Sequence, residues 1–237
     1  MKGVVLAGGR GTRLYPLTRI VNKHLLPVGQ HPMIFYSIKK LCEAGIKDIL
    51  LVTGKESLGM FAAYLGSGKQ WGVKITYRVQ DEPGGIAQAL VLAEDFIPPG
   101  EKFVALLGDN LFDAPLGPEI AAFCAQSKGA RVLIKKVRDP ERFGVPRFVN
   151  GKIIGIDEKP SLPKSKYAVT GIYFYDSTVF ATINTLNASK RGELEITDVN
   201  NRYAQAEELS FGVLPGWWTD AGTIETLYAA GKAMLGR

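Results

Sequence analysis

Three glycines and two arginines fall within eight residues near the start of the chain, in the segment Leu6-Ala-Gly-Gly-Arg-Gly-Thr-Arg13, directly after an apolar run. Glycine lets the backbone approach an anion closely, and its amides can then donate hydrogen bonds to that anion. Arginine adds positive charge and a planar set of donors for phosphate oxygens. The segment therefore has the composition of a phosphate-binding loop, although a glycine-rich turn with surface arginines would have the same composition.

Residue spacing excludes two familiar phosphate-binding loops. A P-loop ends in Gly-Lys-Ser/Thr, and no such sequence follows here. The dinucleotide fingerprint Gly-x-Gly-x-x-Gly has Leu14 at the position of its third glycine. A phosphate site at this loop must therefore be of another kind and use residues from other parts of the chain.

The elements that would position such a site alternate along the first half of the chain. Apolar runs bounded by turn residues predict strands, and apolar residues at helical spacing predict helices. The expected strands are 2–7, 48–53, 73–79, 102–107 and 130–137, and the expected helices are 31–44, 57–65, 86–95 and 119–127. This alternation predicts an α/β fold with a mostly parallel, Rossmann-like sheet flanked by helices.

The second half of the chain has a different pattern. Asn150-Gly151 predicts a tight hairpin turn within 148–156. Further strands are expected at 168–175 and 210–214, and further helices at 177–186, 196–207 and 223–235. Because no linker, repeat or low-complexity tract interrupts the chain, we expect a single domain over 1–237, with a smaller part in the C-terminal half.

Polar residues follow several of the expected strands. Ligands of an open parallel sheet bind beyond the carboxyl ends of its strands. Arg13 and Lys23 come after the first strand, Gln80 after the third and Asp109 after the fourth, so these side chains should meet at one edge of the sheet. A carboxylate beside a phosphate suggests a bridging Mg²⁺, and the two cations would balance the charge of a polyphosphate.

Composition narrows the function classes. Lysine and arginine exceed aspartate and glutamate by 29 − 23 = 6, but the longest basic runs are pairs, which argues against a nucleic-acid partner. A phosphorylated small molecule and a solvated basic surface both stay open. No run of ~18 apolar residues is present, so we expect no membrane span. Cys42 and Cys124 are expected to be plain buried thiols, which predicts a reducing, cytoplasmic location.

A series of motifs, in order along the chain, resembles the signature of the sugar-1-phosphate nucleotidylyltransferases. The stretches that carry the resemblance are Leu6–Leu14, Asn22-Lys-His-Leu-Leu-Pro27, Gly85-Ile-Ala-Gln-Ala89, Leu107-Gly-Asp-Asn110, Glu158-Lys-Pro160, Arg191-Gly-Glu-Leu-Glu-Ile-Thr197 and Trp218-Thr-Asp-Ala-Gly222. Within that family the chain is most similar to the subgroup that makes dTDP-glucose and pyrophosphate from dTTP and glucose-1-phosphate.

The resemblance implies a Mg²⁺-dependent nucleotidyl transfer and assigns residues to it. Arg13 and Lys23 would be catalytic, and Asp109 and Asp220 would hold Mg²⁺. The nucleotide-binding residues would be Leu6, Gly8, Gly9, Gly11, Thr12, Arg13, Lys23, Gln80, Gly85 and Asp109. His24 stands where relatives often have glutamine, and we expect it to line the nucleotide pocket.

The resemblance also implies a sugar-phosphate site formed by Gly144, Glu158, Lys159, Val169 and Arg191. The nucleotide-binding part would then cover about 1–137 and the sugar-binding part about 138–237. Transfer from UTP, transfer to another sugar-1-phosphate, and a non-catalytic regulator that binds sugar nucleotides stay open as alternatives. The sequence lacks the C-terminal helical tail of longer relatives, so a homo-oligomer and family-type feedback also stay open.

Overall fold

The computed structural model describes residues 1–189 and 191–235, and these form two compact units. Of the described residues, the N-terminal unit contains Lys2–Pro83, Leu106–Leu116 and 216–235, and the C-terminal unit contains Met1, Gly84–Ala105, 117–189 and 191–215. The units are assembled from separate chain segments, whereas the parts expected from the sequence, about 1–137 and 138–237, are continuous. The expectation of a single domain stays a prediction.

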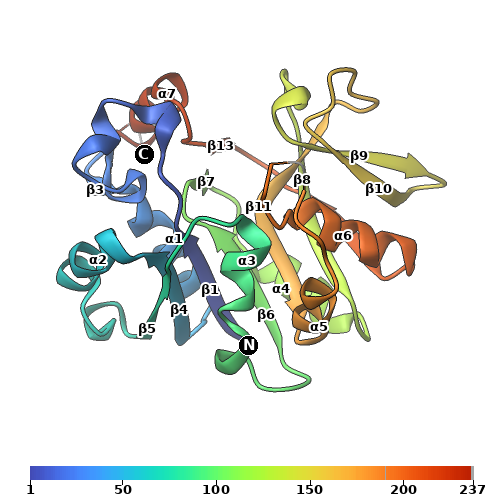
Figure 1. Ribbon diagram of the computed structural model, residues 1–237, viewed down its shortest axis with the longest axis horizontal. Coiled ribbons are helices and arrows are strands. Elements are labelled where there is room, and N and C mark those ends of the chain that lie inside the picture. Colours follow the sequence, from blue (N-terminus) through green and yellow to red (C-terminus); the bar gives the residue numbers. More distant parts are fainter. Residues whose placement is uncertain (190, 236–237) are drawn as a thin grey trace. The chain divides into compact units, whose positions relative to one another are not determined.

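The N-terminal unit is built on a parallel sheet with the strand order β6-β1-β4-β5 (Figure 1). Its strands are β1 (Lys2–Ala7), β4 (Asp48–Gly54), β5 (Lys74–Gln80) and the last two residues of β6 (Lys102–Leu107). β1 and β4 are nearly continuous apolar runs that are buried on both faces, as expected of central strands in a parallel sheet. Their carboxyl ends lead directly into the glycine-rich loop and its neighbours.

Three α-helices belong to this unit: α1 (Met33–Glu43), α2 (Leu58–Leu65) and α7 (Ile224–Leu235). α1 buries Ile34, Ile38 and Leu41 on one stripe and exposes Lys39 on the other side. The helix begins later than the expected 31–44, because Pro32 occupies its N-cap position and His31–Pro32 forms β3, which pairs with β2 (Pro27–Val28).

Two three-residue strands of the N-terminal unit were not expected from the sequence. β7 (Asn110–Phe112) and β13 (Trp218–Asp220) pair antiparallel, with Asp220 opposite Asn110. Leu111 of this ladder belongs to a buried cluster with Val28, Met33, Ala221 and Ala230. The ladder thereby joins the segment after β6 to the segment before α7.

The C-terminal unit has the strand order β12-β8-β11-β6, in which β11 runs antiparallel to β8 and β12 runs parallel to it. Its strands are β8 (Ala130–Lys136), β11 (Tyr167–Asp176), β12 (Leu209–Val213), the first four residues of β6, and the hairpin of β9 (Gly144–Val149) and β10 (Lys152–Glu158). Its helices are α3 (Ile86–Val91), α4 (Gly117–Ala125), α5 (Thr178–Asn184) and α6 (Ile196–Gln205).

The hairpin turns at Asn150 and Gly151, which both have positive φ values of 49° and 75°. These are the conformations of a two-residue primed turn, so the expected hairpin is confirmed. The expected fold class, a mostly parallel α/β sheet flanked by helices, is confirmed as well.

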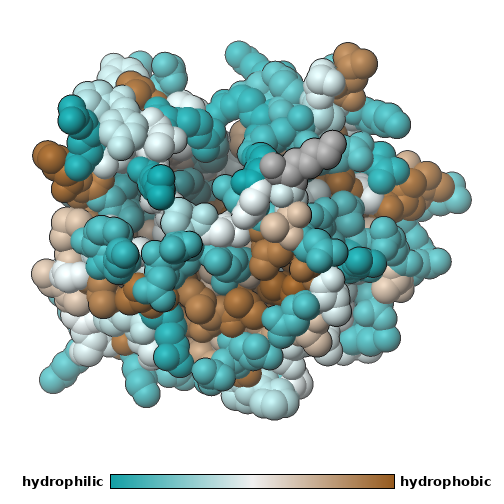
Figure 2. All heavy atoms as spheres, in the orientation of Figure 1, coloured by the Kyte–Doolittle hydropathy of each residue, from teal (hydrophilic) through white to brown (hydrophobic). Residues whose placement is uncertain are grey.

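The surface in Figure 2 is mostly hydrophilic, with hydrophobic side chains in separate patches. Cys42 and Cys124 are both free, as expected, but neither is fully buried: Cys42 is half-buried and Cys124 is exposed on α4, so the expectation of buried thiols is wrong for Cys124 and met only in part by Cys42. Among the helices that the structure describes, none is long and apolar enough to cross a membrane.

Candidate active site

The glycine-rich loop starts where β1 ends, and the side chain of Gln80 lies directly against it. A Cβ built on Gly8 would lie 2.5 Å from Oε1 of Gln80, so a side chain at this position would displace the amide. Gln80 is only 7% exposed, at the end of β5, which excludes a plain surface glutamine. The loop after β1 and the end of β5 therefore meet, as their places in the sheet predicted.

Gly11 keeps the far end of the loop close to Lys23. Its φ of +60° is in the left-handed region, and a Cβ there would lie 3.1 Å from Cβ of Lys23. The hydroxyl of Thr18 donates to the Gly11 carbonyl oxygen at 2.8 Å. A 3-10 turn at Thr12–Leu14 then presents Thr12 and Arg13 at the surface. Gly9 also has a positive φ, but the space around it is open.

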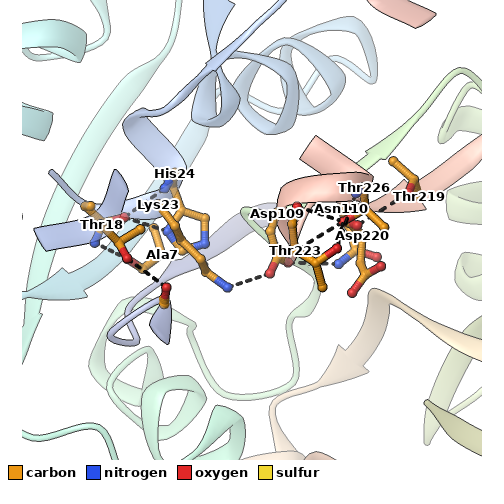
Figure 3. Close-up of polar contacts among 12 residues, drawn as sticks. Ala7, Thr18, Lys23, His24, Asp109, Asn110, Thr219, Asp220, Thr223 and Thr226 are labelled. Atoms are coloured by element: carbon orange, nitrogen blue, oxygen red, sulfur yellow. Dashed lines mark hydrogen bonds and ion pairs between the residues drawn. The ribbon is translucent and has the colours of Figure 1, made fainter. Parts of the chain in front are cut away.

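Lys23 and Asp109 form an ion pair of 2.5 Å between Nζ and Oδ2, with side chains that are 16% and 12% exposed (Figure 3). The second carboxylate oxygen of Asp109 accepts from Nδ2 of Asn110 at 3.0 Å. Burial alone would raise the pKa of Asp109, but the charge of Lys23 and its hydrogen bond outweigh this and hold the pKa well below its usual range. The carboxylate is therefore ionised at neutral pH.

The ladder between β7 and β13 brings Asp220 to the side of Asp109 opposite Lys23 (Figure 3). Asp220 stands opposite Asn110, and the Ala221 amide donates to the Asp109 carbonyl oxygen at 2.9 Å. A Cβ built on Gly222 would lie 3.0 Å from Nη2 of Arg13 and 3.2 Å from Oδ2 of Asp220. The guanidinium of Arg13 and the carboxylate of Asp220 thus flank the same point of the backbone.

The two carboxylates form a donor set that fits Mg²⁺. This cation prefers oxygen ligands and usually takes only one or two protein carboxylates, with water and substrate phosphates as its other ligands. Within residues 1–189 and 191–235, no group of three or more His, Cys, Asp or Glu residues could hold a metal. An all-protein cage of the kind that binds zinc is therefore not found in the described chain, whereas an open site with two acidic ligands fits it.

His24 differs from the expectation that it lines the nucleotide pocket. It is 1% exposed, and its ring lies against Gly108, where a Cβ would come within 2.8 Å of Cδ2 of His24. Nδ1 of the ring is 2.8 Å from Oδ1 of Asn22. Burial, and after it the charge of Lys23, lowers the pKa of His24 to about 3, so the ring is neutral at physiological pH.

Gly144, Lys159 and Arg191, three of the residues expected to bind the sugar phosphate, lie around a fourth, Glu158, in the C-terminal unit. Glu158 ends β10 opposite Gly144, and its Oε2 accepts from the Thr197 hydroxyl at 2.6 Å. Its Oε1 is 3.3 Å from Nζ of Lys159 and 3.4 Å from Nη2 of Arg191. The side chains of Lys159 and Arg191 are 49% and 46% exposed, so both cations can reach a ligand from solvent.

Lys159 has an unusual backbone conformation, with a φ of +45°. Its amide donates to the Phe143 carbonyl oxygen at 3.0 Å, which ties the segment after β10 to the segment before β9. Arg191 is held by Glu195, whose Oε1 is 2.8 Å from Nη2; this hydrogen bond is the main cause of a raised Arg191 pKa. Left-handed residues other than glycine concentrate at functional sites, so this segment is a candidate binding segment.

Two further predicted residues lie in the same unit. Val169 is partly buried on β11 and stands opposite Ile134 of β8. Gly85 has a φ of +103°, and a Cβ there would lie 2.5 Å from the Leu194 carbonyl oxygen. The chain packing around residue 194 thus requires glycine at this position, a reason that the sequence did not reveal.

The structure brings together ten of the predicted residues in the N-terminal unit: Leu6, Gly8, Gly9, Gly11, Thr12, Arg13, Lys23, Gln80, Asp109 and Asp220. The other six predicted residues lie in the C-terminal unit: Gly85, Gly144, Glu158, Lys159, Val169 and Arg191. Two residues beside the candidate sites had no role predicted from the sequence: Thr197, which ends the Arg191–Thr197 motif, and Asn22, which begins the Asn22–Pro27 motif.

Comparison with known proteins supports the reading of these motifs. A family model described as nucleotidyl transferase matches residues 2–236. A glucose-1-phosphate thymidylyltransferase from Neisseria meningitidis is 47% identical, over 97% of this chain and 81% of its own length. Another from Mycolicibacterium smegmatis is 45% identical over the same shares of both chains.

Two solved structures of similar fold also belong to nucleotide-transferring enzymes by their descriptions. A Bacillus anthracis protein assigned to the glucose-1-phosphate thymidylyltransferases, in complex with a sucrose, matches with a TM-score of 0.96 and 53% identity over 100% of this chain and 96% of its own. A UDP-glucose pyrophosphorylase complexed with UDP-glucose matches with a TM-score of 0.87 and 25% identity over 99% and 98% of the two chains. From its loop motifs, its fold and these relatives, the chain belongs to the nucleotidyl transferase family.

Proposed function

We propose that the protein transfers a thymidylyl group from dTTP to glucose-1-phosphate, with Mg²⁺, and releases dTDP-glucose and pyrophosphate. The observation that carries this proposal is the buried Lys23–Asp109 pair beside the glycine-rich loop, in a chain 40–47% identical to curated glucose-1-phosphate thymidylyltransferases. A cytoplasmic location and assembly into a homo-oligomer stay predictions.

The chemistry suits the residues of the N-terminal unit. An oxygen of the sugar phosphate attacks the α-phosphorus of the triphosphate, a new phosphorus–oxygen bond forms, and the bond to the bridging oxygen breaks as pyrophosphate leaves. The attacking oxygen is already ionised, so no strong base is required. Catalysis must come from alignment and from balancing crowded negative charge.

Each candidate residue has a role in that balance. The backbone of Gly8, Gly9 and Gly11 would approach the triphosphate closely, with Leu6 and Thr12 bordering it. Arg13 would bind the triphosphate and stabilise the leaving pyrophosphate, and Lys23 would bind the α-phosphate. Arginine and lysine make charge-assisted hydrogen bonds to phosphate, which are stronger than neutral ones.

Asp109 and Asp220 would hold Mg²⁺, which when bound would neutralise oxygens of the triphosphate. Their arrangement supports this role, because the β7–β13 ladder fixes the backbone of one against the backbone of the other. Two carboxylates beside Lys23 and Arg13 also keep the protein's own charges close to balance before the substrate arrives.

The pyrimidine base would be recognised by Gln80 and the backbone of Gly85. A side-chain amide offers one donor group and one acceptor, which match the edge of thymine or uracil. Because the two bases differ by one methyl group, a hydrophobic contact would discriminate by only about 1–3 kcal/mol. The likeness to a UDP-glucose pyrophosphorylase makes UTP the second candidate nucleotide.

The sugar phosphate would be bound by Lys159 and Arg191, and Glu158 would accept hydrogen bonds from sugar hydroxyls. Both side chains are about half-exposed, and each has a nitrogen within 3.4 Å of Oε1 of Glu158, which supports this assignment. Gly144 and Val169 would contribute backbone contacts.

Our first prediction concerns the substrates. With glucose-1-phosphate and Mg²⁺, the protein should release pyrophosphate fastest from dTTP, as measured by kcat/KM in a coupled pyrophosphate assay with each nucleoside triphosphate in turn. A higher kcat/KM for UTP would assign the protein to uridylyl transfer. Binding of dTDP-glucose without pyrophosphate release from any triphosphate would instead support a non-catalytic regulator.

The second prediction concerns the acidic pair. Asp109→Asn should lower kcat/KM by at least about 100-fold, because a carboxylate that would hold the Mg²⁺ needed to balance the charge of the reacting phosphates is lost. Asp220→Asn should raise the Mg²⁺ concentration required for half-maximal activity. The control is Asp113→Asn, which removes the same charge from an exposed aspartate that accepts from the Trp217 amide. Near-normal activity of Asp109→Asn would contradict the metal assignment.

The third prediction concerns the sugar phosphate. Lys159→Met and Arg191→Met should each raise the KM for glucose-1-phosphate by roughly 10- to 100-fold, the value of one charge-assisted hydrogen bond. The KM for dTTP should change little. Lys152→Met is the matched control, since Lys152 pairs with Glu207 and lies on the same hairpin. Equal changes in both KM values would show that the two cations do not select the sugar phosphate.

The fourth prediction concerns stability and pH. The folded pKa of His24, about 3, lies below its unfolded value of ~6.5, so as the pH falls the unfolded chain takes up this proton first. Stability that is present above pH ~6.5 is therefore lost progressively toward pH ~3. At pH 5 the loss should be about 2 kcal/mol in the free energy of unfolding.

Urea unfolding at pH 7 and pH 5 measures this loss. His24→Gln should lose about 2 kcal/mol less between the two pH values than the wild type. The comparison variant is His31→Gln, which also removes one histidine but keeps His24. If His24→Gln retained the full pH dependence, other groups would be responsible for it.

A further inference from the structure

We propose that Asn22 and His24, which flank Lys23, are positioning residues that hold the lysine ammonium at its place beside Asp109. This inference rests on the proposed function, because it concerns how the transfer is aligned. It assigns a role to two residues whose hydrogen bonds described above are to other protein groups.

Asn22 uses both ends of its side-chain amide. Oδ1 is 2.9 Å from the His24 backbone nitrogen and 2.8 Å from the His24 ring nitrogen Nδ1. Nδ2 donates to the Ala7 carbonyl oxygen at 3.3 Å and to the Ser57 hydroxyl at 3.1 Å. One side chain thus ties the turn that carries Lys23 to the end of β1 and to the turn after β4.

His24 fixes the other side of Lys23. Its ring lies against Gly108, which directly precedes Asp109, so closely that a Cβ on Gly108 would lie 2.8 Å from Cδ2 of the ring. The ring is 1% exposed, and its Nδ1 lies 2.8 Å from Oδ1 of Asn22. The residue after Lys23 is therefore packed against the residue before Asp109.

The consequence is a fixed separation between two charged groups. Asn22 anchors the Lys23 backbone to the end of β1 and to the turn after β4, and His24 packs against Gly108, between the end of β6 and Asp109. The lysine side chain can then make its 2.5 Å contact with Oδ2 of Asp109 while only 16% of the side chain is exposed. Displacement of a positioned group by about 1 Å can lower a rate by 100-fold, so loss of either anchor should act on catalysis through Lys23.

A double-mutant cycle tests this inference. Asn22→Ala should lower kcat for dTTP and glucose-1-phosphate by roughly 10- to 100-fold, with a much smaller change in the KM for dTTP. In a Lys23→Met background, Asn22→Ala should lower the residual kcat by less than about threefold. The reason is that the effects of two mutations are not additive when one residue acts through the other. Asn22→Ser can still cap the turn and should recover part of the lost kcat.

A merely structural role gives a different pattern. Equal losses of kcat in both backgrounds, or wild-type kcat in Asn22→Ala, would overturn the proposal. Gln126→Ala is the control for loss of a well-bonded amide, since Gln126 donates to the Lys128 and Glu208 carbonyl oxygens in the C-terminal unit; it should leave kcat close to wild type in both backgrounds.

Thermal unfolding of every variant shows whether the comparison is between folded proteins. If Asn22→Ala does not fold, Asn22→Ser takes its place in the cycle with a smaller expected loss of kcat, and equal losses with and without Lys23 would again overturn the proposal. Failure of the proposed function is distinguishable, because the wild-type protein would then release no pyrophosphate from any nucleoside triphosphate.

Discussion

The buried ion pair between Lys23 and Asp109 is the constraint on which the candidate site depends. Removing two charges from water is expensive, and their attraction offsets this only with good geometry and further hydrogen bonds. Here Asn110 satisfies the second oxygen of Asp109, and the contact of 2.5 Å leaves little room for water between the charges. A buried pair of this kind is weak evidence for stability and better evidence for a functional site.

The topology explains why such a pair can form from residues far apart in the sequence. In a parallel sheet the carboxyl ends of β1, β5 and β6 lie at one edge, so the glycine-rich loop, Gln80 and Asp109 meet there. Asp220 reaches the same edge by another route, the short antiparallel ladder between β7 and β13. The edge of the sheet therefore carries the glycine-rich loop that is expected to bind phosphate, and the ladder adds the second carboxylate, Asp220.

The alternation of apolar runs and helical segments was sufficient to predict the fold class and nearly all of the long elements. It missed β7 and β13, because three-residue strands are too short to show a period of two. Without that ladder, the nearness of Asp109 and Asp220 rested on family resemblance alone. It also misplaced the start of α1, since Pro32 can serve as an N-cap as well as a first-turn residue.

Side-chain environments were harder to predict than the elements. The sequence suggested that His24 lines a pocket and that Cys124 is a buried thiol. In the structure the His24 ring is buried and the Cys124 thiol is exposed. Burial depends on which distant segment covers a residue, here Gly108 for His24. The requirement for glycine at position 85 likewise comes from the Leu194 carbonyl oxygen, more than a hundred residues away in the sequence.

A neutral ring at position 24 is what the charge arrangement requires. Lys23 already supplies one positive charge to the Asp109 carboxylate, and a protonated imidazole in the same buried space would repel the lysine ammonium. Burial and Lys23 together lower the pKa of His24 to about 3, so the ring serves as an uncharged spacer throughout the physiological range. A residue whose charge could change near neutral pH is thereby kept neutral, and no positive charge on the ring opposes the ammonium of Lys23.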